Sequence, residues 1–130
     1  VDDGAIELKV DEIVDKDIVC TVVHGNPLGS RKTMNLPGTI IRLPALAEKD
    51  IADLKTACEH DYDFVAISFA RNLDDIRQVR KVLDENGGKD IKIITKIENV
   101  EGLSNLEDIL NEADGQMIAR GDMATETDFT

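Results

Sequence analysis

The chain has 130 residues, 42% of them hydrophobic and 32% charged, which is typical of a globular protein with a small core. Its 15 basic and 27 acidic side chains give a formal net charge of −12, a field that repels nucleic acid and anionic lipid. No apolar run approaches the ~20 residues that a membrane helix needs. We therefore expect neither a nucleic-acid nor a membrane partner.

The two cysteines, Cys20 and Cys58, have neither the spacing of metal ligands nor that of a disulfide framework. Both lie in apolar segments, so we interpret them as buried thiols and expect a cytoplasmic protein. Residues 1–4 read as a strand that is already ending, and residues 125–130 carry no stop signal. We expect the sequence to be part of a longer protein.

The first 36 residues predict β structure. Residues 5–14 alternate apolar and polar positions with the period of two expected of a half-exposed strand. Residues 17–25 predict a second, more apolar strand, and Asp15 to Asp17 provide turn chemistry between the two. Glycines and prolines over residues 25–38 predict a loop before the pattern changes.

From residue 45 onward, helix and strand patterns alternate. Apolar stripes at helical spacing predict helices over residues 46–60 and 73–85, the second one capped by Asn72. Ser104 and Glu107 have the spacing of a capping box, which predicts that a third helix begins there. Apolar runs predict strands at residues 63–70, 91–97 and 116–119; we expect the first to be covered on both faces and the third to be buried.

This βαβαβ order predicts a parallel sheet, either doubly wound or part of a (β/α)8 barrel. In both architectures ligands bind at the carboxyl ends of the strands. The residues at or just past the carboxyl end of each predicted strand are therefore the candidates for function, and they are Ser68, Arg71, Lys96, Glu98, Arg120, Gly121 and Asp122.

The candidate residues suit a divalent cation beside a phosphoryl or enolate oxygen. Lys96 and Glu98 project to the same face, because side chains alternate along a strand. Glu98 and Asp122 would offer two carboxylates from adjacent strand ends, which Mg²⁺ favours when water and substrate oxygens complete its shell. Lys96 would supply a positive charge. Gly121, in a predicted turn, would let an anion approach backbone N–H groups.

Each of these residues also has an ordinary structural interpretation. Lys96 and Glu98 could form a plain ion pair, which in most proteins contributes little energy. Ser68 could be a hydrogen-bonded strand serine. His24 and His60 have no ligand partner at metal-site spacing, so we assign them no function. The functional interpretation is favoured because the candidate residues lie at the ends of successive strands.

The segments "NLPG", "DFVAISFAR", "IKIITKIENVEG" and "DGQMIARGDM" resemble the pyruvate kinase family, and the resemblance covers nearly the whole chain. It implies an α/β fold, a partial (β/α)8 TIM barrel of about three parallel strands with helices, preceded by a β-rich segment. Residues 1–34 would be the C-terminal part of a β-rich lid domain. Residues 35–130 would be a partial TIM-barrel domain.

The resemblance also implies an activity, the transfer of a phosphoryl group from phosphoenolpyruvate to ADP, giving pyruvate and ATP in glycolysis. Lys96 would stabilise the transferring phosphoryl group as the catalytic lysine, Glu98 and Asp122 would bind Mg²⁺ or Mn²⁺, and Lys32 would reach the nucleotide phosphates. The family also uses K⁺, whose ligands are absent from this chain, and is usually homotetrameric. The substrate would be bound by Ser68, Lys96, Ala119, Arg120, Gly121 and Asp122.

Three departures from the family pattern stand out. Thr33 and Ala124 occupy positions where the family usually has glycine, and Thr127–Asp128 replaces an expected Ile-Pro. Added Cβ atoms could tighten a phosphate-binding loop. Because three strands cannot close a barrel, we expect this chain alone to be inactive. The alternatives are a truncated non-catalytic fragment or pseudoenzyme and, as a less favoured one, a Mg²⁺-dependent lyase of the phosphoenolpyruvate/pyruvate barrel type.

Overall fold

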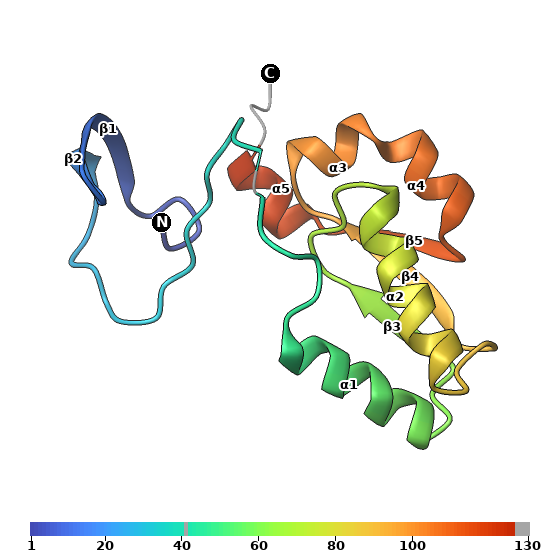
Figure 1. Cartoon of the computed structure of the whole chain (residues 1–130). Coiled ribbons are helices and arrows are strands. Elements are labelled where there is room, and N and C mark those ends of the chain that lie inside the picture. Colours follow the sequence, from blue (N-terminus) through green and yellow to red (C-terminus); the bar gives the residue numbers. More distant parts are fainter. Residues whose placement is uncertain (41, 127–130) are drawn as a thin grey trace. The chain divides into compact units, whose positions relative to one another are not determined.

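The computed structural model describes residues 1–40 and 42–126, with the side chains of residues 125 and 126 left aside. The Thr127–Asp128 departure therefore lies outside the described residues. The chain divides into two compact units, Val1–Leu36 and Pro37–Thr130 (Figure 1). No helix within the described ranges is both long and apolar enough to span a bilayer.

The first unit is built on an antiparallel hairpin of β1 (Glu7–Val14) and β2 (Asp17–His24). The predicted turn is present: Val14 pairs with Asp17, and Asp15 takes a left-handed conformation with φ of 55°. The expectation that one face of these strands is buried is wrong. Every β1 residue is exposed, because no helix or further sheet within residues 1–36 packs on the hairpin.

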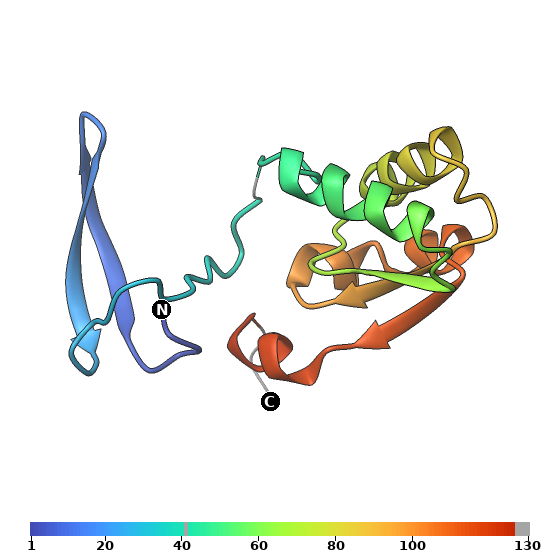
Figure 2. The same ribbon diagram turned by 90° about the horizontal axis from the view of Figure 1, so that it is seen from below.

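The second unit contains a three-stranded parallel sheet in the order β3-β4-β5. The predicted α/β class and the open, partial barrel are confirmed, with boundaries within three residues of those predicted. Figure 2 shows α1 and α2 side by side along one face of the sheet. The strands are β3 (Phe64–Ile67), β4 (Lys92–Ile97) and β5 (Gly115–Ile118), and the helices are α1 (Glu48–Glu59), α2 (Leu73–Glu85), α3 (Val100–Ser104), α4 (Leu106–Glu112) and α5 (Arg120–Glu126).

The core of this unit lies between the sheet and its helices. Alternate β4 residues face the helices, while the intervening ones face the opposite side, which no helix of the described residues covers. Burial of this apolar cluster fixes the register of β4 and thereby decides which face Lys96 occupies. The cluster comprises Ala57, Ile76, Val79, Leu83, Ile91, Ile93, Ile97 and Ile109.

Two expectations about the strands are wrong. Phe64 of β3 is 60% exposed and Met117 of β5 is 48% exposed, so neither strand is covered on both faces. A continuous apolar run is buried on both faces only where a second layer of structure packs on the sheet. No element of the described residues forms such a layer on this open sheet.

The predicted capping box at Ser104 and Glu107 is also wrong. Asn99 caps the short helix α3 instead, accepting a hydrogen bond from the Gly102 N–H at 2.8 Å. The Ser104 hydroxyl donates to the Val100 carbonyl at 2.9 Å, inside the last turn of α3, and α4 begins only at Leu106.

Asp114 joins β4 to β5 and makes the stability of this unit pH-dependent. Its Oδ2 accepts from the Ile93 N–H at 2.9 Å, and its Oδ1 pairs with Lys92 Nζ at 3.2 Å. The Ile93 hydrogen bond, followed by Lys92 and Arg80, lowers the pKa of Asp114 below its usual value. A lowered folded-state pKa stabilises the fold above the unfolded pKa of about 3.9, and this contribution is lost as pH falls toward the lower folded value.

We therefore expect Asp114→Asn to flatten the decline of unfolding free energy below about pH 4. Urea unfolding at pH 7, 5, 4 and 3 measures that slope. Asp108→Asn, at an exposed carboxylate in the first turn of α4, is the matched control. Identical slopes in the wild type and Asp114→Asn would contradict the assigned cause.

Candidate active site

Lys96 and Glu98 meet at the carboxyl end of β4. The Lys96 Nζ lies 2.5 Å from Glu98 Oε1 and 3.1 Å from the Ser68 hydroxyl oxygen, at the end of β3. The three side chains share a face because β3 and β4 pair in parallel with Ile67 opposite Thr95, which brings Ser68 level with Lys96. The intervening Ile97 points into the core. The geometry unites three of the residues predicted from strand ends.

Glu98 is the most enclosed ionisable group of this cluster, with 1% of its surface exposed. Its Oε2 accepts a hydrogen bond from the Phe69 N–H at 2.6 Å, while Oε1 faces Lys96. A buried carboxylate requires such partners, because an unpaired charge in the interior is costly. Lys96 keeps 24% of its side chain exposed, so its ammonium group can still reach an anionic ligand.

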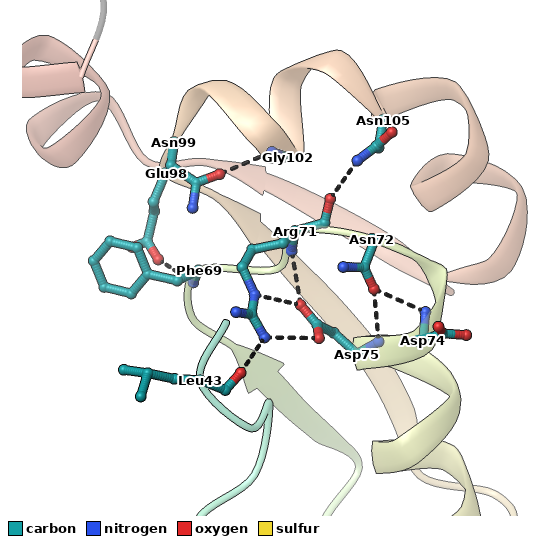
Figure 3. Close-up of polar contacts among 10 residues, drawn as sticks. All are labelled: Leu43, Phe69, Arg71, Asn72, Asp74, Asp75, Glu98, Asn99, Gly102 and Asn105. Atoms are coloured by element: carbon teal, nitrogen blue, oxygen red, sulfur yellow. Dashed lines mark hydrogen bonds and ion pairs between the residues drawn. The ribbon is translucent and has the colours of Figure 1, made fainter. Parts of the chain in front are cut away.

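The connection from β3 to α2 supplies the second hydrogen bond to Glu98. Phe69 adopts φ of 52°, a left-handed conformation that is uncommon for a bulky residue. Next to it, the Arg71 guanidinium forms two hydrogen bonds with the buried Asp75, and Asp75 raises the pKa of Arg71 (Figure 3). Sequence reasoning identified Arg71 as a strand-end residue but missed both Phe69 and Asp75. The i,i+4 spacing of Arg71 and Asp75 was the available signal.

The segment after β5 is a helix and not the turn that the sequence predicted. Ala119 accepts the first helical hydrogen bond, from the Met123 N–H at 3.3 Å, and α5 starts at Arg120. Arg120 and Gly121 are exposed, and Asp122 is half-buried in the first turn. Because Ile97 of β4 is opposite Ile118 of β5, the first turn of α5 follows the end of the strand next to the one that carries Glu98.

Lys32 belongs to the other unit. Its Nζ lies 3.0 Å from Asp2 Oδ1, and the neighbouring Thr33 carbonyl accepts from the Asp2 N–H at 2.9 Å. These contacts tie residues 32 and 33 to the segment that precedes β1. A nucleotide-binding role for Lys32 stays a prediction.

The donor chemistry at Glu98 fits a hard divalent cation. Each Glu98 oxygen uses one lone pair for its present partner and has another available. Among residues 1–40 and 42–126, no three His, Cys, Asp or Glu side chains are grouped so as to hold a metal ion. A cation here would therefore take one or two carboxylates and fill its shell with water and ligand oxygens, as Mg²⁺ commonly does.

An open parallel sheet with a lysine and a buried carboxylate at its strand ends belongs to the class of α/β proteins in which ligands bind at the carboxyl ends of the strands. A family model described as "Pyruvate kinase, barrel domain" matches residues 1–130. The chain belongs to the pyruvate kinase family.

Curated relatives named pyruvate kinase agree with that assignment. The protein from Clostridium perfringens is 50% identical over 126 residues, covering 97% of this chain and 27% of the relative. That from Dictyostelium discoideum is 48% identical over 127 residues, covering 95% and 25%. That from Geobacillus stearothermophilus is 44% identical over 128 residues, covering 96% and 22%. The chain thus spans about a quarter of the length of these relatives.

Proposed function

We propose that this chain supplies part of an active site that transfers a phosphoryl group from phosphoenolpyruvate to ADP, giving ATP and pyruvate. The observation that carries the proposal is the pairing of Lys96 with the buried Glu98 beside Ser68 at two adjacent strand ends. Membership of the pyruvate kinase family supports it. The chain is one portion of the site.

Lys96 has the role of neutralising negative charge on the transferring phosphoryl group. Phosphoryl transfer depends mainly on positioning and on groups that offset charge as it develops on the equatorial oxygens. Glu98 and Ser68 hold the ammonium group in one place, so that little reorganisation is needed when substrate binds. A bound Mg²⁺ or Mn²⁺ would neutralise the same oxygens, with Glu98 and Asp122 as its protein ligands.

The remaining assignments belong to the same proposal. Ala119, Arg120 and Gly121 would bind the substrate at the start of α5, and Lys32 would approach the nucleotide phosphates. Residues 1–34 would be part of a lid domain. The protein would require K⁺, form homotetramers and act in the cytoplasm, where its two unpaired cysteines would stay reduced.

A Mn²⁺ titration followed by electron paramagnetic resonance tests the metal part of this proposal. We expect Glu98→Gln to weaken Mn²⁺ binding by about 10-fold or more, because the amide removes one anionic oxygen donor. Glu112→Gln is the matched control, since that carboxylate is also paired with a basic side chain, Arg77, but lies on α4 and is 37% exposed. Equal Mn²⁺ affinity in Glu98→Gln and wild type would reject Glu98 as a ligand.

A further inference from the structure

The Phe69 backbone is held in a conformation that it would not adopt by itself. A non-glycine residue with φ of 52° has a strained backbone, and such a conformation persists only where the surroundings enforce it. This conformation aims the Phe69 N–H at Glu98 Oε2, 2.6 Å away. The contacts that enforce this conformation of Phe69 therefore also determine where the Glu98 carboxylate lies.

Arg71 is the anchor of this connection. Its Nε and Nη2 donate to the two carboxylate oxygens of Asp75, each at 3.0 Å, and Nη2 also donates to the Leu43 carbonyl at 3.1 Å (Figure 3). The Arg71 N–H donates to Asp75 Oδ2 at 3.1 Å, so backbone and side chain hold the same acceptor. With 12% of the Arg71 side chain and 7% of the Asp75 side chain exposed, this pair is shielded from water.

Two further contacts restrict the backbone of residues 69–71. Asn105 Nδ2 donates to the Arg71 carbonyl at 2.9 Å, from the junction of α3 and α4. The Ala70 N–H donates to the Lys96 carbonyl at 3.3 Å. The backbone on both sides of Arg71 is therefore fixed, and Phe69 has little freedom to rotate toward a right-handed conformation.

We propose that Arg71 is a positioning residue, whose two-pronged pairing with Asp75 fixes the Phe69 N–H against Glu98 and so orients the carboxylate beside Lys96. The proposal goes beyond the proposed function and rests on it only for the ligand that Glu98 takes. The guanidinium fork is essential, because a lysine ammonium is a point charge that cannot span both Asp75 oxygens and the Leu43 carbonyl with the same geometry.

The Phe69 amide proton resonance measures this effect directly. A hydrogen bond to a carboxylate at 2.6 Å moves an amide proton downfield, so we expect the resonance to shift upfield in Arg71→Lys. Arg77→Lys is the matched control, because Arg77 lies on α2, the helix that contains Asp75, and pairs with the exposed Glu112. Mn²⁺ affinity should fall about 10-fold in Arg71→Lys and stay constant in the control, as outer-shell substitutions at metal sites do.

A merely structural role for Arg71 would lower the melting temperature and leave the Phe69 resonance in place, and that result overturns the proposal. If circular dichroism shows Arg71→Lys to be unfolded, Asp75→Asn decides instead. It replaces one of the two acceptor oxygens that the Arg71 guanidinium uses, so an unmoved Phe69 resonance there overturns the proposal too. If the wild type does not bind Mn²⁺, the metal part of the proposed function fails, and the Phe69 resonance still decides this inference.

Discussion

Replacing Gly102 with alanine is expected to destabilise the unit Pro37–Thr130 by about 3 kcal/mol. A Cβ at residue 102 would lie 2.4 Å from the Ala70 carbonyl oxygen and 3.2 Å from Asn99 Oδ1. A backbone carbonyl cannot rotate away as the end of a flexible side chain can. Either α3 or the connection around Ala70 must move, and Phe69 with its hydrogen bond to Glu98 would move with it.

The expected loss of stability is opposite in direction to the usual effect of replacing glycine with alanine in a helix. In an ordinary exposed helix, alanine in place of glycine stabilises by about 1 kcal/mol. Gly121→Ala in α5 is the matched control, because no heavy atom of the described residues lies within 4 Å of a Cβ there. Urea unfolding measures the change in unfolding free energy for Gly102→Ala and for Gly121→Ala. If Gly102→Ala unfolds at the same or a higher urea concentration than the wild type, α3 does not approach Ala70 closely.

The order of the elements and the face occupied by Lys96 could be predicted from the sequence. Both follow from local rules: apolar runs separated by helical stripes predict a parallel sheet, and the period of two in a strand places Lys96 and Glu98 on the face opposite Ile97. The position of Ser68 beside Lys96 follows from the same rules, because residues at the ends of neighbouring parallel strands are level with each other.

The hydrogen bonds that orient Glu98 could not be predicted in this way. The left-handed Phe69 carries no glycine or asparagine signal, because contacts from Arg71, Lys96 and Asn105 enforce its conformation across long stretches of sequence. The close approach of Gly102 to Ala70 is likewise a tertiary contact. A sequence shows which residues can pair and seldom which of several possible pairs forms.

The errors in predicted burial and capping have physical causes of the same kind. Phe64 and Met117 have sequence contexts suited to burial, but burial depends on a second layer that the described residues do not provide. Asn99 caps α3, which begins before Ser104. Ser104 is therefore the last residue of α3, and its hydroxyl donates to a carbonyl of the same helix. Local capping signals compete, and here the Asn99 side chain accepts the capping hydrogen bond at the start of α3.

In a full-length enzyme that contains this chain, Lys96→Met is expected to reduce the proposed phosphoryl transfer by about 100-fold or more in kcat, the loss typical when one charge-stabilising group is removed from an active site. Methionine preserves much of the length and apolar volume of the lysine stem and removes the ammonium group. The substitution also leaves the buried Glu98 carboxylate without its cationic partner and with the hydrogen bond from the Phe69 N–H, so the melting temperature must be measured in parallel. Lys92→Met is the matched control: it lies on the same strand, at the opposite end, and pairs with Asp114.

The most direct measurement of the central claim uses a chimera, in which this chain replaces the matching 126 residues of the Clostridium perfringens relative. Pyruvate formation from phosphoenolpyruvate and ADP is followed in a coupled assay. We expect the chimera to turn over, the Lys92→Met form to match it, and the Lys96→Met form to lose at least about 100-fold in kcat. Equal turnover by the Lys96→Met and Lys92→Met forms would contradict the assignment of phosphoryl transfer to this strand end.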